Sequence, residues 1–272
     1  MKMKRPLAVL AIILALGSIV PAPLYAVDPA VTAPALAPDR KVEARGLIQK
    51  GLDAYGAFSS YEARMHRELR LKSGRLKIDE MFLRYDKPRT IFLKYTGGSQ
   101  ASLQVLYSEG NFDGKLMTRP PGAMFDFIPI VAMSPDDKRI KNEESRPIQN
   151  AGIGHLIEKF SRDWVEAEAA GQASVTSVMR DEVAMYGMEG GEPVKTTRLE
   201  VLLKTPGRAY PKVVVQFRES DGLPVQMELF AEGSASPDES YTYYAIQTDP
   251  AKNDPVFVSM IDKRLLEYYR KL

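Results

Sequence analysis

The sequence predicts an α+β protein built on one large antiparallel sheet that wraps around helices as a half-barrel. Three observations lead to this prediction. Segments in which apolar and polar residues alternate with a period of two follow one another through most of the chain. Glycine-containing turn dipeptides separate several of these segments, which favours hairpins between sequence neighbours. Segments with helical spacing stand before and in the middle of the strands, so helices are available to cover the apolar face of the sheet.

The N-terminal residues predict an exported protein. Residues 1–26 combine a basic start with an apolar run of fourteen residues, Leu7 to Val20, and end at the small residue Ala26. The run is too short for a comfortable membrane span, so we interpret residues 1–26 as a cleaved signal peptide, with an uncleaved anchor as the alternative. Residues 27–39 are rich in proline and alanine and are expected to form a flexible leader.

The absence of cysteine and the balance of charges limit the compartments and partners that can be expected for this protein. The chain has no cysteine, so no lipid can be attached at a cleavage-site cysteine, and we predict a periplasmic protein that is not a lipoprotein. Three of the 37 Lys and Arg residues lie in the predicted signal peptide, which leaves 34 basic residues against 35 acidic ones. This balance gives no reason to expect nucleic acid as a partner. No Pro/Gly/Ser-rich linker divides the interior, so residues 40–272 are predicted to form a single half-barrel domain, expected to be a monomer.

Helices are predicted at three places. Residues 40–58 carry apolar side chains at roughly helical spacing with charges between them. Residues 150–169 place several large apolar side chains on one side and have Gly152 and Gly154 in the first turn. The last residues, 258–272, are expected to form a C-terminal helix.

The remaining segments are predicted as strands. In 61–72 the odd positions are apolar apart from Arg67 and the even positions are all polar, which predicts one buried and one solvent-exposed face. The next strand, 75–85, changes phase near Glu80, and we attribute the change to a β-bulge. Further strands are predicted at 90–95, 102–108, 115–119, 174–187, 195–204, 212–218, 224–231 and 239–248. The sheet is therefore expected to contain about 9–11 strands.

The stretch "VLYSEGNFDGKLMTRPPG", residues 105–122, could be a catalytic loop, a phosphate-binding loop or a simple turn. Gly110-Asn111 and Asp113-Gly114 are strong turn dipeptides. A phosphate-binding loop would need its glycines to open a helix, whereas a strand-like segment and two prolines follow here. We therefore interpret the stretch as a hairpin.

Residue types that carry catalysis or bind metals are sparse. The two histidines, His66 and His155, stand alone in a strand and in a helix. The paired carboxylates Asp136-Asp137 and Glu143-Glu144 fit no calcium-ligand pattern, and no zinc spacing or nucleophile motif occurs. A hydrolase would need a pair of carboxylates or histidines that meet in a cleft. We predict that the protein is not an enzyme and has no catalytic residues, metal or cofactor.

A long irregular segment, residues 119–147, interrupts the predicted strands. Connections of this length usually form lids, binding loops or mobile insertions. The segment contains a dense apolar patch next to a charged tail: Met124, Phe125, Phe127, Ile128, Ile130, Val131 and Met133. We predict that residues 123–133 act as a movable lid.

The apolar surfaces of the predicted elements can be interpreted in two ways. The sheet face, the helices and the apolar loop can fill one another as an ordinary core. Alternatively, two helices cannot seal a half-barrel and a hydrophobic cavity remains, for which the twelve methionines provide an adaptable lining. The candidate residues for lining such a cavity are Met65, Arg67, Leu69, Phe82, Leu93 and Met117.

The order of elements resembles the LolA-type lipoprotein-carrier superfamily. In that superfamily a Lys-Pro or Arg-Pro element ends one strand, and an Asp-Gly turn follows further along; Lys87-Pro88 and Asp113-Gly114 match these features. The stretch at 105–122, together with "RPIQNAGIGHLIEKF" at 146–160, is similar to the bacterial family catalogued as domain of unknown function 1571. The likeness covers roughly residues 45–257.

The resemblance implies an open antiparallel half-barrel, LolA-like, whose concave face is capped by helices and holds acyl chains or another lipid. It implies no catalytic residues. In some members an arginine on an inner strand ties down the lid, and Arg67, with lid carbonyls as partners, is the best physical candidate here. This chain departs from the carriers in its longer loop at 119–147 and its extra C-terminal helix.

Two functions remain as expectations. The first is an exported, non-catalytic carrier or chaperone that binds a lipid, acyl chain or lipoprotein in a hydrophobic cavity. The alternative is an envelope sensor or scaffold that binds a protein partner through the same fold without cargo. An apolar loop beside a half-barrel favours the first, whereas a dry core and an exposed apolar patch would favour the second.

Overall fold

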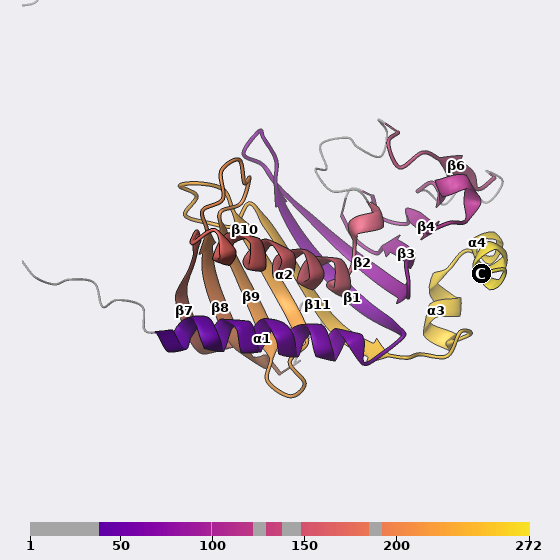
Figure 1. Ribbon diagram of the computed structural model, residues 1–272. Helices are drawn as coiled ribbons and strands as arrows, with labels where there is room; N and C mark the ends of the chain where they lie inside the picture. The colour runs from indigo at the N-terminus through magenta and orange to yellow at the C-terminus, as the bar shows by residue number, and fades with distance from the viewer. Residues whose placement is uncertain (1–37, 99, 122–128, 138–147, 185–191) are drawn as a thin grey trace, which may run out of the picture. The chain divides into compact units, whose positions relative to one another are not determined.

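The computed structural model describes residues 38–98, 100–121, 129–137, 148–184 and 192–272 (Figure 1). The strands are β1 (Ser60–Arg70), β2 (Leu76–Asp86), β3 (Thr90–Tyr95), β4 (Gln104–Ser108), β5 (Leu116–Arg119), β6 (Val131–Met133), β7 (Ala173–Val183), β8 (Val194–Leu203), β9 (Lys212–Arg218), β10 (Pro224–Phe230) and β11 (Glu239–Thr248). The helices are α1 (Pro38–Gly56), α2 (Ile153–Ala169), α3 (Pro255–Met260) and α4 (Lys263–Arg270), with 3-10 turns at Phe112–Gly114 and Ile148–Asn150.

The predicted fold class is confirmed: in the described residues the strands form one open antiparallel sheet of eleven strands. Their order is β6-β5-β4-β3-β2-β1-β11-β10-β9-β8-β7, so two meanders are joined where the last strand pairs with the first. The ten predicted strands are all present. The eleventh, β6, is an edge strand inside the segment predicted to be irregular. The predicted hairpin between β4 and β5 is also confirmed.

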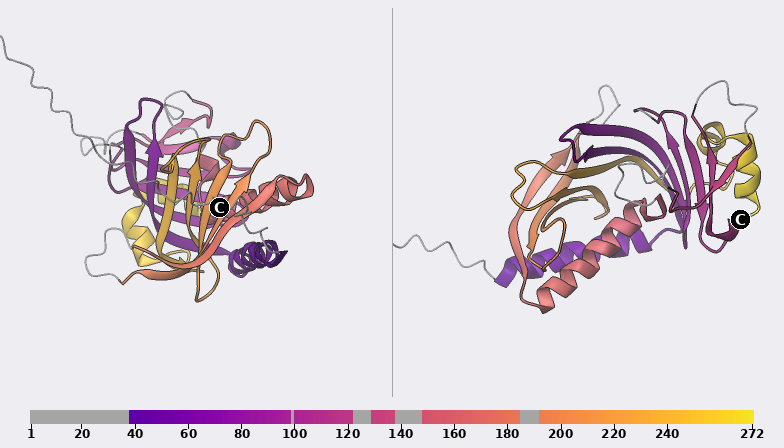
Figure 2. Two further views of the ribbon diagram at one scale, coloured as in Figure 1. Left: turned by 90° about the vertical axis from the view of Figure 1, so that its left-hand side faces the viewer. Right: turned by 90° about the horizontal axis from the view of Figure 1, so that it is seen from above.

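The two faces of the sheet carry different helices. Seen from above, α1 and α2 lie inside the curve of the sheet, whereas α3 and α4 lie outside it, next to the strands that follow β2 (Figure 2). The main apolar core lies on the concave side and contains residues of α1, α2 and most strands, among them Trp164 and Phe217. A second core on the convex side joins Phe82 and Phe92 to Phe257 of α3 and to α4. The C-terminal helix predicted at 258–272 is therefore two short helices that bury convex surface.

The prediction of a β-bulge in β2 near Glu80 is wrong. Strands β1 and β2 pair without interruption, and the irregularity in β1 lies in its pairing with β11, between Glu62 and Arg64. The apolar and polar residues of β2 change phase for another reason. Asp79 occupies a concave-face position because it pairs with Arg67 across the strands. Phe82, on the convex face, is apolar because the C-terminal helices cover it.

The prediction of a solvent-exposed outer face is wrong for part of β1, where a side chain of β2 is buried as well. Glu62 is 3% exposed and Arg84 is 1% exposed. The Arg84 Nη1 atom donates to Glu62 Oε1 at 2.6 Å and to the carbonyl oxygen of Ala251 at 3.1 Å. The guanidinium also lies over the rings of Phe257 and Tyr269, at 4.7 and 5.4 Å from their centroids. This arginine therefore holds the C-terminal helices on the convex face.

The Lys87-Pro88 element connects the sheet to helix α1. The Lys87 Nζ atom donates to the carbonyl oxygens of Tyr55, at 2.6 Å, and of Phe58. Tyr55 lies in the last turn of α1 and Phe58 lies two residues beyond its end, where main-chain acceptors lack partners within the helix. The ammonium group also lies 4.2 Å from the centre of the Tyr55 ring, and burial lowers the pKa of Lys87. The lysine therefore ends the helix and fixes its direction against β2.

We predict that Gly154→Ala lowers the free energy of unfolding by about 1–3 kcal/mol. A β-carbon at Gly154 would lie 2.1 Å from the ring of Tyr55, so α1 and α2 must separate to admit it. Gly46→Ala is the matched control, because a β-carbon at this helical position meets nothing within 4 Å. The control should raise the free energy of unfolding by about 0.5–1 kcal/mol, because alanine lowers the conformational entropy of the unfolded chain. Urea unfolding measures both changes; equal effects of the two substitutions would contradict the close approach of the helices.

Candidate functional site

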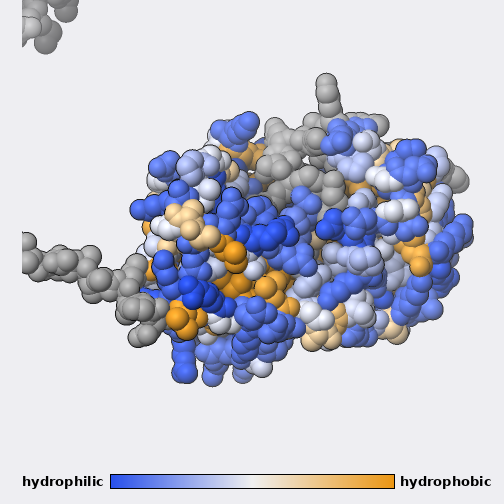
Figure 3. Space-filling view, viewed as in Figure 1, coloured by the Kyte–Doolittle hydropathy of each residue, from blue (hydrophilic) through white to orange (hydrophobic). Residues whose placement is uncertain are grey.

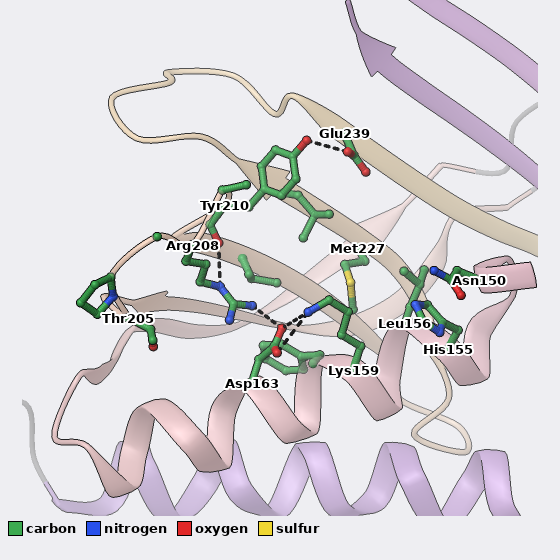
Figure 4. A pocket seen from close by; sticks show the side chains of 16 residues that line it. Asn150, His155, Leu156, Lys159, Asp163, Thr205, Arg208, Tyr210, Met227 and Glu239 are labelled. Carbon is green, nitrogen blue, oxygen red and sulfur yellow. Dashed lines mark hydrogen bonds and ion pairs between the residues drawn. The ribbon is translucent and has the colours of Figure 1, made fainter. Parts of the chain in front are cut away.

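A pocket of about 660 Å³ lies between α2, the loop that joins β8 to β9, and the concave face of strands β9 to β11 (Figure 4). Its walls are apolar where the sheet and the inner side of α2 face each other. The apolar lining residues are Leu156, Phe160, Val213, Met227 and Leu229. The volume falls within the range of about 300–1,000 Å³ that is usual for small-molecule sites. The pocket can therefore accommodate a mainly apolar ligand.

A charged cluster stands at one wall of this pocket. Lys159 and Asp163 are four residues apart on α2, and the Lys159 Nζ atom lies 2.8 and 3.1 Å from the two carboxylate oxygens of Asp163. Arg208, in the β8–β9 loop, donates from Nη2 to the same carboxylate and from Nε to the carbonyl oxygen of Tyr210 at 3.0 Å. Figure 4 shows the two cationic side chains approaching Asp163 from different elements. The cluster thus ties the loop to the helix across the pocket.

Two opposed effects set the acidity of Asp163. Its burial would raise the pKa of this carboxyl, but the hydrogen bonds and charges of Lys159 and Arg208 outweigh the burial and hold its pKa below the ordinary value. Asp163 is therefore ionised at neutral pH. Two cations share one carboxylate, so the cluster carries one positive charge in excess.

A second polar group lies on the sheet side of the pocket. Glu239, the first residue of β11, is 1% exposed. The hydroxyls of Tyr210 and Tyr241 donate to its two carboxylate oxygens at 2.6 and 2.7 Å. A buried carboxylate needs such donors because it has left its hydration shell. Through its hydroxyl, Tyr210 also links the β8–β9 loop to the sheet, so the loop is held on both sides of the pocket.

A smaller cavity of about 30 Å³ lies next to this pocket and shares Asn150 and Leu156 with it. Three residues predicted from the sequence line the cavity: Met65, Arg67 and Leu93. Leu69 is buried on the same face of β1, two positions beyond Arg67. The structure therefore brings four of the six candidate residues to the concave side of the sheet.

The other two candidates lie elsewhere. Phe82 and Met117 belong to the convex core, where α3 and α4 cover them. The prediction that all six residues share one cavity is therefore wrong for this pair. Both residues are apolar, which suggested that they face the concave core. They are apolar because α3 and α4, from the distant C-terminal segment, bury them on the convex face.

Arg67, the lone charge among apolar neighbours on β1, is paired with a carboxylate. Its Nη2 atom donates to Asp79 Oδ2 at 2.6 Å, and Asp79 is fully buried. The Lys77 Nζ atom lies 3.5 Å from the same oxygen. The predicted contact of Arg67 with lid carbonyls concerns residues outside the described part of the chain and stays a prediction.

The predicted lid falls only partly on described residues. Met124, Phe125, Phe127 and Ile128 lie outside them. Ile130 packs against the convex core, and Val131 and Met133 belong to the edge strand β6, paired with β5. In the described part, this segment extends the sheet rather than covering the pocket.

The residues of the charged cluster were not predicted from the sequence. The spacing of Lys159 and Asp163 was a usable signal, since i,i+4 pairs share one helix side. Arg208 lies in a Pro-Gly turn far along the chain, and no local pattern joins it to α2.

The two histidines lie on different faces of the sheet, and the predicted pair Glu143-Glu144 lies outside the described residues. His155 lines the pocket, whereas His66 contacts Glu80 and Glu68 on the convex face of β1 and β2. Within the described ranges, no group of three His, Cys, Asp or Glu side chains could hold a metal ion. Among the same residues, no helix is long and apolar enough to cross a membrane.

A family model described as a protein of unknown function, DUF1571, matches residues 58–260. The chain belongs to this family. The match includes all eleven strands and α3 and stops before α4. It confirms the family expected from the stretches at 105–122 and 146–160. No curated protein matches the chain.

Several solved structures are similar to this chain. A LolA superfamily protein from Nitrosomonas europaea is 9% identical, with a TM-score of 0.31 over 75% of this chain and 93% of that one. The lipoprotein LppX from Mycobacterium tuberculosis is 9% identical, with a TM-score of 0.36 over 75% and 94% of the two chains. The MucA/MucB complex of Pseudomonas aeruginosa gives 14% identity and a TM-score of 0.40 over 82% of this chain and 62% of that one. The likeness at these values carries no conclusion about ligands.

Proposed function

We propose that the protein is an exported, non-catalytic carrier that binds the acyl chain of a lipid or lipoprotein in the concave pocket. The observation that carries the proposal is the pocket itself, about 660 Å³ of space between α2 and the sheet with an apolar wall. Burial of a chain there gains about 0.8 kcal/mol for each methylene removed from water. In this proposal the signal peptide at 1–26 directs export, and residues 40–272 act as one binding domain.

The proposed ligand lies beside α2. The small cavity, which shares Asn150 and Leu156 with the pocket, is lined by Met65 and Met81. Methionine side chains have several low-energy rotamers and can repack around a chain that enters. The β8–β9 loop, held by Arg208 and Tyr210, is the described segment that covers the pocket.

Equilibrium binding of a fluorescent fatty acid to the mature protein tests the proposal. We expect saturable binding to one site and displacement by unlabelled lipids with acyl chains. Binding should tighten as the chain lengthens, until the pocket is full, because each added methylene is buried. Binding that does not depend on chain length, or no binding of any acyl probe, would refute the carrier function.

A second candidate is binding of an envelope protein without cargo. Figure 3 shows apolar surface in the region of α1 and α2. Val42 of α1 is 62% exposed and Val165 of α2 is 60% exposed, and both are among the exposed large hydrophobic side chains of the described residues. Val42→Ser and Val165→Ser test this candidate in cells that lack the wild-type protein. If these variants fail to replace the wild-type protein although they bind acyl chains normally, binding of a protein partner is favoured over the carrier function.

A further inference from the structure

The charged cluster beside the apolar pocket has more positive than negative charge. Lys159 and Arg208 both contact Asp163, and the side chains of the three residues are 46%, 18% and 16% exposed. The cluster is therefore partly shielded and still open to solvent on the lysine side. The other described acid of the pocket, Glu239, accepts hydrogen bonds from the hydroxyls of Tyr210 and Tyr241 on the sheet side.

Both cations keep hydrogen-bonding capacity for another group. A guanidinium has five N–H donors, and the described contacts of Arg208 use two of them, to Asp163 and to the carbonyl oxygen of Tyr210. Lys159 has three N–H donors and contacts only the Asp163 carboxylate in the described residues. An anion that reaches the cluster can therefore bind both side chains in exchange for their contacts with Asp163.

Apolar and cationic surfaces meet at this wall. Phe160 directly follows Lys159 on α2 and precedes Asp163 by three residues, and Val213 and Met227 of the sheet line the same pocket. A molecule that places a hydrocarbon chain against these residues has its polar end within reach of Lys159 and Arg208. Anionic heads are favoured there, because charge-assisted hydrogen bonds to carboxylate or phosphate are stronger than neutral ones.

We propose that the pocket selects amphiphiles with an anionic head group, a phosphate or a carboxylate, which Lys159 and Arg208 bind in place of Asp163. The inference rests on the proposed acyl-chain binding and specifies its ligand class. Asp163 acts as an internal substitute for the head group: it neutralises the cations in the empty pocket and competes with the ligand when one enters.

Three probes with the same palmitoyl chain test the head-group preference: lysophosphatidic acid, palmitate and the neutral monopalmitoylglycerol. We expect wild-type protein to bind both anionic probes at least about tenfold more tightly than the neutral probe. A preference for lysophosphatidic acid over palmitate would identify phospholipid as the source, and the reverse would identify free fatty acid. Equal affinity for all three would overturn the head-group inference and leave acyl binding intact. No binding of any probe would refute the proposed function itself.

Two substitutions with opposite expected effects separate recognition from simple loop anchoring. Arg208→Gln should weaken the binding of the anionic probes about tenfold more than the binding of the neutral probe. Asp163→Asn removes the competing carboxylate at nearly constant shape, so it should strengthen binding of the anionic probes. If the cluster only anchors the loop, both substitutions weaken all three probes alike, which would overturn the inference. Arg180→Gln is the matched control, since Arg180 is on β7, outside the pocket, with a side chain 91% exposed.

Discussion

Arg84→Met is expected to lower the free energy of unfolding by about 3–5 kcal/mol, the usual cost of removing one partner from a buried ion pair. Glu62, which is 3% exposed, would keep its place beneath the C-terminal helices without the guanidinium that now lies 2.6 Å away. The contacts of Arg84 with Phe257 and Tyr269 would be lost at the same time. Urea unfolding followed by circular dichroism measures the change.

The same variant should show a distinctive pH dependence. Burial raises the pKa of Glu62 and Arg84 lowers it, with burial the larger effect. Without Arg84 the pKa of Glu62 rises further. A group whose pKa is raised on folding stabilises the protein only while it is protonated, and this contribution is lost as the pH rises through the folded-state pKa. The stability difference between wild type and Arg84→Met should therefore be larger at pH 8 than at pH 5.

An exposed ion pair provides the control for this prediction. Arg89 and Glu109 lie 3.2 Å apart with side chains 36% and 52% exposed. Arg89→Met should cost less than about 1 kcal/mol, because solvent screens the pair. If the two arginine variants lose similar stability, or if the loss at Arg84 does not depend on pH, the buried pair does not hold the C-terminal helices as described.

Met227→Trp is expected to weaken acyl-chain binding about a hundredfold. Met227 lies on β10 in the wall of the pocket, and the larger indole would occupy space that the chain needs. Exclusion of about four methylenes costs roughly 3 kcal/mol of binding free energy, or about two orders of magnitude in Kd. Titration with the fluorescent fatty acid measures the loss, and thermal melting shows that the variant remains folded.

Met117→Trp is the matched control, since Met117 is a buried methionine in the convex core on the other face of the sheet. It should reduce stability, because that core is closely packed, and leave binding unchanged in the folded protein. The opposite pattern, with binding lost at Met117 and kept at Met227, would place the ligand under α3 and α4 and contradict the proposed site.

Much of the fold could be predicted because alternation and turn chemistry are local signals. The strand that contains Arg67 and the hairpin around Asp113-Gly114 follow from residues that are neighbours in sequence. The burial of Glu62 could not be predicted in this way. It depends on Phe257 and Tyr269, about two hundred positions away, whose helices cover an outer face that the strand pattern alone marks as exposed.

Residues of the small cavity could be predicted from the sequence, whereas the larger pocket could not. Met65 and Leu93 follow from the inward positions of their strands, so the floor of the small cavity could be identified from the sequence. The larger pocket depends on where the β8–β9 loop crosses α2, which the contact between Arg208 and Asp163 fixes. Such a contact between distant segments has no periodic signal.

Native mass spectrometry of the protein purified from the cells that produce it, followed by lipid extraction, tests the central claim most directly. The account predicts a bound mass that extracts as one class of lipid with an acyl chain and an anionic head group. Met227→Trp, prepared in parallel, should be recovered without that mass, whereas Met117→Trp should retain it. Wild-type protein that is empty, and that takes up no added phospholipid or acylated peptide, would contradict the account.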